Sequence, residues 1–305
     1  MEILTSISSI EAKIHAYRTR TWNHDSADIH QHTDHSQAHD QPKLVGFVPT
    51  MGYVHEGHMS LIQQAKMQCD FVIMSIFVNP LQFAPHEDYD HYPRDHERDC
   101  AFAEAAGVDV VFLPDRHMMY PQPTQTLVRV SGLTETCEGT SRPGHFDGVA
   151  TVVLKLFHIV KPDKAYFGLK DAQQVAMIQQ MVYDLNMHID IVACPTWREA
   201  DGLAMSSRNV YLNPEQRAQA VVLSQALKLL EHYMENMQNP QPEELIRIAT
   251  KQINSAPLAH IDYIHVAAYP SFQTLNPNHN TCIIALAVFF GQTRLIDNLI
   301  IPIRR

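Results

Sequence analysis

The chain has 305 residues, of which 45% are hydrophobic and 18% are charged, and its formal net charge is −10. This composition is typical of a soluble globular protein, and the length allows two domains. The acidic balance argues against a nucleic-acid partner, because neutralising a phosphate backbone requires clustered Lys and Arg. It leaves room for a small anionic ligand in a local positive pocket.

Cysteine usage and the N-terminal pattern predict a cytoplasmic protein. The five cysteines are scattered and form no CxxC pair, which is typical of reduced thiols: Cys69, Cys100, Cys137, Cys194 and Cys282. The opening MEILTSISSIEAKI has no basic region ahead of an apolar core, so we expect no signal peptide. The longest apolar run, CIIALAVFF, is too short to span a membrane.

The first predicted element is a helix over residues 3–22, where isoleucines recur at helical spacing. Residues 23–42 then hold five histidines and four aspartates but almost no apolar residues. Such a segment cannot bury a face, and we interpret it as a surface loop inserted in the domain. The alternative is a metal-binding tract, because short His-rich segments bind Zn or Ni.

Short apolar strands alternating with helices follow the insert. The predicted strands are 44–48, 71–78, 108–113, 164–168 and 188–194, and helices are predicted at 147–161 and 171–186. This alternation indicates a Rossmann-like, doubly wound parallel sheet over residues 1–194. In such a sheet ligands bind outside the carboxyl ends of the strands.

The pattern changes after Cys194 and indicates a smaller α+β domain over residues 195–305. A loop at 195–213 leads to a long helix that begins at Pro214, with Asn213 as its N-cap. A second helix is predicted from about Pro242. Strands are predicted at 260–269 and 282–290.

The most informative stretch is VGFVPTMGYVHEGHMSLIQQAK, residues 45–66. It predicts a buried strand, a glycine-containing turn and a helix, and a helix N-terminus favours phosphate binding. Gly52 and Gly57 allow close backbone approach to a ligand. His55 and His58, three residues apart, share one helix face and can donate hydrogen bonds to charge that develops on a phosphate. The HEGH spacing is one residue too short for the zinc-binding HExxH pattern.

This arrangement is the HxGH motif of nucleotidyltransferases and class I aminoacyl-tRNA synthetases, which act at the α-phosphate of ATP. PTMGYVHEGH also resembles the signature of the pantothenate synthetases (pantoate–β-alanine ligases). Five later segments resemble that family in the family's order: FVNPLQF (77–83), YPRD (92–95), SRPGHFDGVATVV (141–153), YFGLKDAQQ (166–174) and READGLAMSSRN (198–209). The resemblance covers residues 44–305, and in the C-terminal third it rests on pattern more than on motifs.

The resemblance implies a ligase that makes pantothenate, a coenzyme A precursor, in two steps. Pantoate attacks the α-phosphate of ATP to give pantoyl adenylate and pyrophosphate, and β-alanine then displaces AMP. It also implies a homodimer in which the smaller domain closes over the active site. Mg²⁺ is expected to bind to the ATP phosphates. We assign no protein ligand to it, although Asp99 is a candidate contact.

The family's site residues transfer to matching positions of this sequence. His58 matches the proton donor, His55 should lie beside the phosphates, and Lys170 supplies a positive charge. The implied ATP site comprises Met51, Gly52, Tyr53, Val54, His55, Glu56, Gly57, His58, Gly168, Leu169, Lys170, Asp171, Trp197, Met205, Ser206, Ser207 and Arg208. Gln82 and Gln174 match the substrate-binding glutamines, and Val152 and Val153 match the apolar wall of the pantoate pocket.

Three positions leave alternatives open. Asp171 can either cap the following helix or meet the ribose. Arg142 can guide an anion or be an ordinary surface residue. Trp197 stands where the family usually has a smaller apolar residue, and a Trp keeps the backbone atoms that contact adenine in the family but adds bulk beside them.

Three other functions compete with the ligase hypothesis. A nucleotidyltransferase that joins AMP or CMP to a phosphate monoester would use the same HxGH site, but it gives no reason for the paired glutamines and the apolar wall. A metal-buffering protein organised around residues 23–42 would not need intact HxGH, GLKD and MSSR motifs. An aminoacyl-tRNA synthetase is disfavoured, because the acidic chain has no tRNA-binding body.

Overall fold

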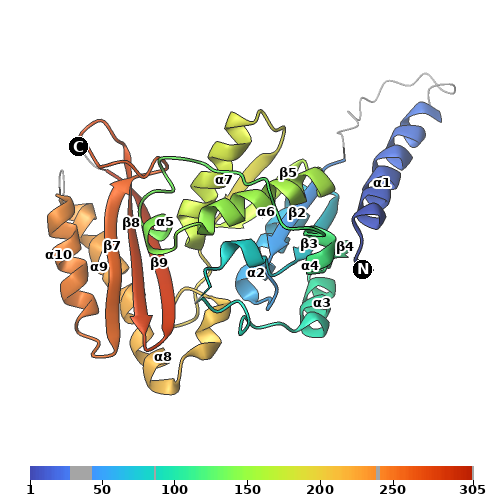
Figure 1. Cartoon of the computed structure of the whole chain (residues 1–305). Coiled ribbons are helices and arrows are strands. Elements are labelled where there is room, and N and C mark those ends of the chain that lie inside the picture. Colours follow the sequence, from blue (N-terminus) through green and yellow to red (C-terminus); the bar gives the residue numbers. More distant parts are fainter. Residues whose placement is uncertain (28–42, 86, 238–240, 304–305) are drawn as a thin grey trace.

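The structure, a computed structural model, describes residues 1–27, 43–85, 87–237 and 241–303. Two sheets organise it, and each has its own covering helices (Figure 1). Residues 2–194 supply the strands of the larger sheet, and residues 259–302 supply those of the smaller one.

The larger sheet has six strands in the order β1-β4-β3-β2-β5-β6, and every neighbouring pair is parallel. The strands are β1 (Glu2–Leu4), β2 (Val45–Thr50), β3 (Phe71–Ile76), β4 (Val110–Phe112), β5 (Lys164–Gly168) and β6 (Asp190–Cys194). Most of these residues are buried, as expected for strands covered on both faces. The predicted doubly wound sheet is confirmed.

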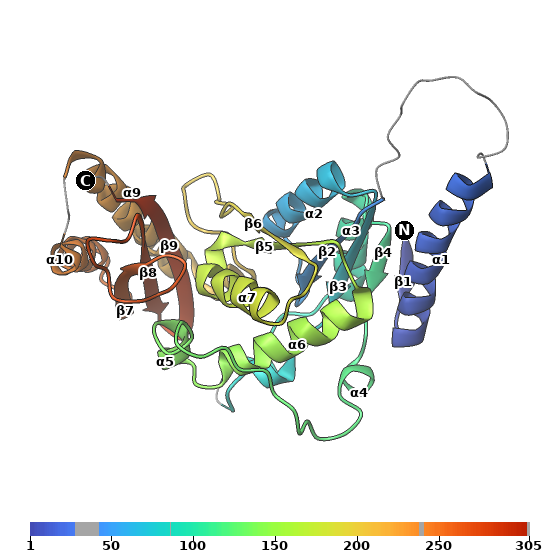
Figure 2. The same ribbon diagram turned by 90° about the horizontal axis from the view of Figure 1, so that it is seen from above.

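Helices cover both faces of this sheet (Figure 2). One face packs against α1 (Ile7–Ala27), α6 (His145–Val160) and α7 (Ala172–Asp184), and the other packs against α2 (Glu56–Gln68) and α3 (His96–Ala105). Side chains alternate between the two cores along each strand. In β2, Phe47 belongs to the first core and Val48 to the second.

The strand order places a topological switch point between β2 and β5. From β2 the chain continues to β3 on one side, whereas β5 and then β6 lie on the other side. The loops that leave β2 and β5 therefore diverge and leave a crevice at their carboxyl ends, where ligands bind in this architecture. Those two loops carry the HxGH and GLKD segments.

The smaller sheet is antiparallel, with the order β7-β8-β9. It comprises β7 (Ala259–Ala268), β8 (Thr281–Phe290) and β9 (Thr293–Pro302), and its helices are α8 (Pro214–Ala220), α9 (Val222–Asn236) and α10 (Pro242–Ile253). One face packs against these helices, and the other packs on α7 and residues near Cys137. The second face turns toward the larger sheet (Figure 1).

Four sequence-based expectations need correction. Residues 2–4 form strand β1, and α1 begins only at Ile7 and extends to Ala27, into the predicted insert; residues 28–42 lie outside the described residues. The helix predicted from Pro214 is interrupted at Val221. Strand β9 was missed, because its inward positions Thr293, Leu295 and Asp297 mix polar and apolar residues and hide the alternation.

The shorter elements are α4 (Arg116–Met119), α5 (Glu138–Ser141) and the 3-10 turns η2 (Pro80–Gln82), η3 (Leu169–Asp171) and η4 (Ser207–Tyr211). Among the described helices, none is both long and apolar enough to cross a bilayer.

The contact between α6 and η2 yields a stability prediction. A Cβ on Gly148 of α6 would lie 2.2 Å from the Leu81 carbonyl oxygen, so Gly148→Ala must push η2 away. We expect this variant to lose about 1–3 kcal/mol of unfolding free energy, the usual cost of overpacking. Gly168→Ala is the matched control, because a Cβ there meets nothing within 4 Å. Urea denaturation would measure both, and equal losses would contradict the prediction.

Candidate functional site

A cavity of about 230 Å³ opens at the carboxyl ends of β2 and β5. The structure brings most of the predicted site residues to its wall: Met51, His55, Gly57, His58, Gln82, Val152, Val153, Gly168, Lys170, Asp171, Gln174, Trp197, Met205, Ser206, Ser207 and Arg208. A second cavity, of about 730 Å³, reaches from there to the smaller sheet. The two cavities share wall residues that include Arg142, Lys170 and Arg208.

A buried carboxylate binds the backbone of the turn between β2 and α2. Gly52 and Tyr53 both have positive φ angles, 84° and 48°. Asp99 of α3 accepts hydrogen bonds from the backbone N–H groups of Tyr53 and Val54, at 2.7 Å each, and is 0% exposed. These bonds compensate the conformational cost of the left-handed turn. Asp99 therefore has no oxygen facing the cavity, and its candidacy as a Mg²⁺ contact was wrong.

His55 and His58 cap α2 with their own rings. His55 is the N-cap residue, and its Nδ1 accepts a hydrogen bond from the Gly57 N–H at 3.2 Å. The Nδ1 of His58 accepts one from the His55 N–H at 3.3 Å. Because both Nδ1 atoms are acceptors, both neutral rings carry their proton on Nε2. The ring centroids are 4.1 Å apart, so two N–H donors stand side by side at the cavity wall.

Gly57 permits this arrangement. A Cβ at residue 57 would lie 2.9 Å from Cε1 and 3.0 Å from Nδ1 of His55, so any side chain would displace the ring. The glycine of the HxGH motif is thus a space requirement for the first histidine.

Both imidazoles are held in the neutral form. Burial, reinforced by the charge of a protonated His58 and by Lys170, lowers the pKa of His55 to about 2. Burial also lowers the pKa of His58 to about 4, against an opposing effect of Asp171. At pH 7 the pair therefore offers two uncharged donors without placing positive charge beside Lys170.

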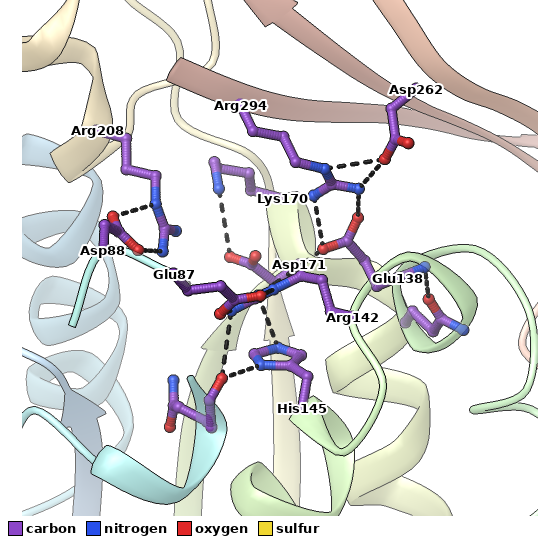
Figure 3. Close-up of polar contacts among 12 residues, drawn as sticks. Glu87, Asp88, Glu138, Arg142, His145, Lys170, Asp171, Arg208, Asp262 and Arg294 are labelled. Carbon is purple, nitrogen blue, oxygen red and sulfur yellow. Dashed lines mark hydrogen bonds and ion pairs between the residues drawn. The ribbon is translucent and has the colours of Figure 1, made fainter. Parts of the chain in front are cut away.

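The cations of the site are paired with carboxylates (Figure 3). Arg208 makes a two-point contact with Asp88, at 2.9 Å for both bonds. Lys170 Nζ lies 3.6 Å from Asp171 Oδ2. Burial works to raise the pKa of Asp88, but the Arg208 guanidinium prevails and holds it below its ordinary value. Asp171 makes no capping hydrogen bond to α7, which removes that alternative.

Arg142 is part of a second charged group rather than an ordinary surface residue. It binds both carboxylate oxygens of Glu87, at 2.8 and 2.6 Å, and also donates to the Gln82 carbonyl at 3.3 Å. His145 lies 3.1 Å from the guanidinium, and burial lowers its pKa to about 4. The group forms part of the wall between the two cavities.

The two glutamines lie at the cavity in different environments. Gln82 is 7% exposed; its Nε2 donates to Met51 Sδ at 2.9 Å, and its Oε1 accepts from Asn79 Nδ2 at 3.1 Å. Gln174 is half-buried and lines both cavities. Val152 and Val153 of α6 form an apolar wall beside them, as the resemblance implies.

Five predicted residues do not line either cavity: Gly52, Tyr53, Val54, Glu56 and Leu169. The first three form the turn that Asp99 holds, and Glu56 is exposed in the first turn of α2.

Trp197 is 47% exposed, and its carbonyl accepts from the Met205 N–H at 3.0 Å. The hydroxyl of Ser207 donates to the Tyr53 carbonyl at 3.4 Å, which links the MSSR segment to the HxGH turn.

Sequence reasoning missed Glu87, Asp88, Tyr92 and His145 as wall residues. Glu87 and Asp88 lie in an irregular loop with no periodicity to reveal their direction. A signal existed for the other two, because Tyr92 belongs to the YPRD segment and His145 to SRPGHF.

Within the described ranges, no group of three or more His, Cys, Asp or Glu residues could hold a metal ion. Two carboxylates of the cavity walls, Asp88 and Asp171, each face a cation instead. This donor set fits a Mg²⁺ ion held chiefly by phosphate oxygens and water, which is the usual form in nucleotide sites.

The depressed pKa values predict that stability falls in acid. Unfolding frees His55 and His58 to bind protons near pH 6.5, which the folded chain resists down to about pH 2 at His55 and about pH 4 at His58. Stability is therefore complete above pH 6.5 and declines as pH falls below it, with a slope of up to about 1.4 kcal/mol per pH unit for each histidine.

Urea denaturation between pH 4 and pH 8 would measure this slope. His58→Asn, which keeps a cap acceptor but cannot titrate, should flatten it. His260→Asn on the exposed part of β7 should leave it unchanged. Identical slopes in the unmodified chain and the His58→Asn variant would contradict the pKa shift.

Comparisons with known proteins agree with this geometry. The family model described as pantoate-beta-alanine ligase matches residues 22–300. A pantothenate synthetase of Caldicellulosiruptor bescii is 54% identical over 85% of this chain and 92% of its own length. A crystal structure of the Thermus thermophilus enzyme of that name has a TM-score of 0.85 and 40% identity, covering 98% of this chain and 99% of its own. The pantoate-beta-alanine ligase of Francisella tularensis, described as complexed with β-γ ATP and β-alanine, has a TM-score of 0.72 and 36% identity, with coverages of 98% and 97%.

Proposed function

The chain belongs to the pantoate-beta-alanine ligase family, and we propose on that premise that it joins pantoate to β-alanine with ATP, giving pantothenate, AMP and pyrophosphate. The observation that carries the proposal is the pair of neutral Nε2–H donors of His55 and His58, beside Lys170 and Arg208 at the switch point of the sheet. This set suits attack at a phosphate.

In the first step, a carboxylate oxygen of pantoate bonds to the α-phosphorus of ATP, and the bond to the pyrophosphate oxygen breaks. The product is an acyl adenylate. A carboxylate is a poor acyl donor until one oxygen becomes part of a good leaving group, and AMP is such a group. His58 and His55 donate to phosphate oxygens as negative charge builds there, and their capping bonds fix the direction of donation.

Lys170 and Arg208 bind the remaining phosphate charge. Lys170 acts as a point charge, whereas the planar guanidinium of Arg208 can hold two oxygens at once. Because Asp88 occupies both bonds of Arg208, the phosphates of ATP must take its place. Mg²⁺, when bound to the phosphates, neutralises part of their charge.

The pocket for pantoate lies where Gln82 and Gln174 face Val152 and Val153. Pantoate has two hydroxyls, a carboxylate and a dimethyl carbon, so it needs amide partners beside apolar walls. Asn79 and Met51 hold the Gln82 amide in one orientation. In the second step, the β-alanine amine bonds to the acyl carbon, AMP leaves with the electron pair, and the amine loses a proton.

We also propose that the enzyme works as a cytoplasmic homodimer with Mg²⁺. The family resemblance supports the dimer, the scattered cysteines support a reducing compartment, and the donor set at the cavity supports a phosphate-bound Mg²⁺.

The test of the proposed reaction is isotope exchange. The chain should exchange labelled pyrophosphate into ATP when pantoate is present and β-alanine is absent, because the adenylate forms first. Omitting pantoate is the control. Equal exchange with unrelated carboxylates, or with phosphate monoesters, would favour the nucleotidyltransferase alternative instead.

The role of His58 can be tested separately from its capping bond. His58→Asn keeps an acceptor for the His55 N–H but removes the Nε2–H donor, so turnover should fall by about 10²–10³ with little loss of stability. The exposed His260→Asn variant serves as the control for replacing a histidine. Turnover within a few-fold of the unmodified chain would remove His58 from the chemistry.

A further inference from the structure

Strand β9 of the smaller sheet reaches into the site of the larger one. It is an edge strand, and Asn298, which pairs with Ala285 of β8, points its amide across to η3. Asn298 Nδ2 donates to the Leu169 carbonyl at 2.8 Å and to the Lys170 carbonyl at 2.9 Å. Both hydrogens of one amide group are thereby used on two consecutive carbonyls of the GLKD segment.

These carbonyls belong to the two peptide planes that flank the Cα of Lys170. The Leu169 carbonyl lies in the plane before it, and the Lys170 carbonyl lies in the plane after it. Fixing both planes fixes φ and ψ of Lys170, and hence the direction in which its side chain leaves the backbone. Gly168, the N-cap residue of η3, has no side chain that could cap this turn, whereas Asn298 binds the turn from the other sheet.

The backbone orientation at Lys170 determines where its ammonium group lies, because the side chain is long. Lys170 lines both cavities, its side chain is 19% exposed, and its Nζ lies 3.6 Å from Asp171 Oδ2. A small rotation at the Cα moves a charge at the end of a four-carbon stem by several times the displacement of the backbone. A misplacement of about 1 Å at a catalytic group can cost about 10²-fold in rate.

The neighbouring residue on β9 holds the second phosphate-binding segment. Asp297 is 2% exposed and binds the Arg198 guanidinium at 2.6 and 3.0 Å, while its Oδ1 accepts the Asn298 N–H at 2.8 Å. Arg198 is bridged to Ala204, just before the MSSR segment. Two adjacent residues of one strand therefore contact both loops that carry phosphate-binding cations.

We propose that Asn298 is a positioning residue for adenylation, acting through Lys170. This inference rests on the proposed function and names a residue that the HxGH, GLKD and MSSR motifs do not include. The competing interpretation is that Asn298 only joins the two sheets. The two interpretations differ in whether Asn298→Ala still lowers the rate in a chain that already carries Lys170→Met.

The experiment measures pantoate-dependent pyrophosphate exchange and thermal unfolding for Asn298→Ala and Asn298→Asp. Both should lower kcat by about 10–100-fold, with a smaller change in the KM for pantoate. Asn298→Asp should be at least as severe as Asn298→Ala, because an isosteric carboxylate repels both carbonyls. If the alanine variant unfolds, the exchange rate of the Asn298→Asp variant serves as the test in its place. Asn254→Ala, at the exposed end of α10, is the matched control and should retain full exchange.

A double variant that also carries Lys170→Met tests whether Asn298 acts through Lys170. If Asn298 acts through Lys170, adding Asn298→Ala to Lys170→Met should change the residual rate by no more than about threefold, because coupled residues are not additive. A full 10–100-fold loss in that background, or a milder effect of Asn298→Asp than of Asn298→Ala, would overturn the inference. Normal exchange in Asn298→Ala would overturn the inference about Asn298 and leave the proposed function standing. A lack of pantoate-dependent exchange in the unmodified chain would instead overturn the proposed function.

Discussion

The site depends on one buried contact, between the Asp99 carboxylate and the backbone N–H groups of Tyr53 and Val54. The chain must reverse within a few residues of β2 so that α2 begins at the switch point, and the turn uses positive φ angles at Gly52 and Tyr53. Burial raises the pKa of Asp99, and the two N–H donors oppose that rise. The direction of α2, and with it the position of both histidines, follows from this contact.

The charges at the cavity show how an acidic chain can bind a polyanion. Arg208, Arg142 and Lys170 face Asp88, Glu87 and Asp171, so each cation has a carboxylate neighbour. Burying an unpaired charge is costly, and each of these carboxylates offsets the charge of one cation at the cavity wall. In the proposed reaction, the cations exchange a carboxylate partner for phosphate oxygens. The neutral histidines fit this arrangement, because two further positive charges would repel Lys170.

Much of the site was predictable from the sequence, since HxGH, GLKD and MSSR are local motifs and follow strands whose apolar runs are plain. Asp99 was found, but its function was misassigned, because sequence spacing does not show that its oxygens meet a turn 45 residues away. Glu87 and Asp88 were not identified, because an irregular loop has no period to give side-chain direction. Strand β9 was missed because buried Asp297 breaks its apolar alternation, and this acid is buried only because Arg198 meets it.

The smaller sheet is therefore more than a cover for the cavity. Its face toward the larger sheet packs apolar residues such as Ala267 and Ile283 against α7, and its edge strand supplies Arg294, Asp297 and Asn298. Arg294 donates two hydrogen bonds to Glu138 of α5, at 3.0 and 2.6 Å (Figure 3). Burial works to raise the pKa of Glu138, but the Arg294 guanidinium prevails and lowers it. Three polar contacts from one strand thus reach α5, the GLKD turn and the segment before MSSR. Because packed elements shift as units, any movement of β9 changes all three together. Lys170 and Arg208 therefore keep their spacing only while the smaller sheet keeps its position relative to the larger one.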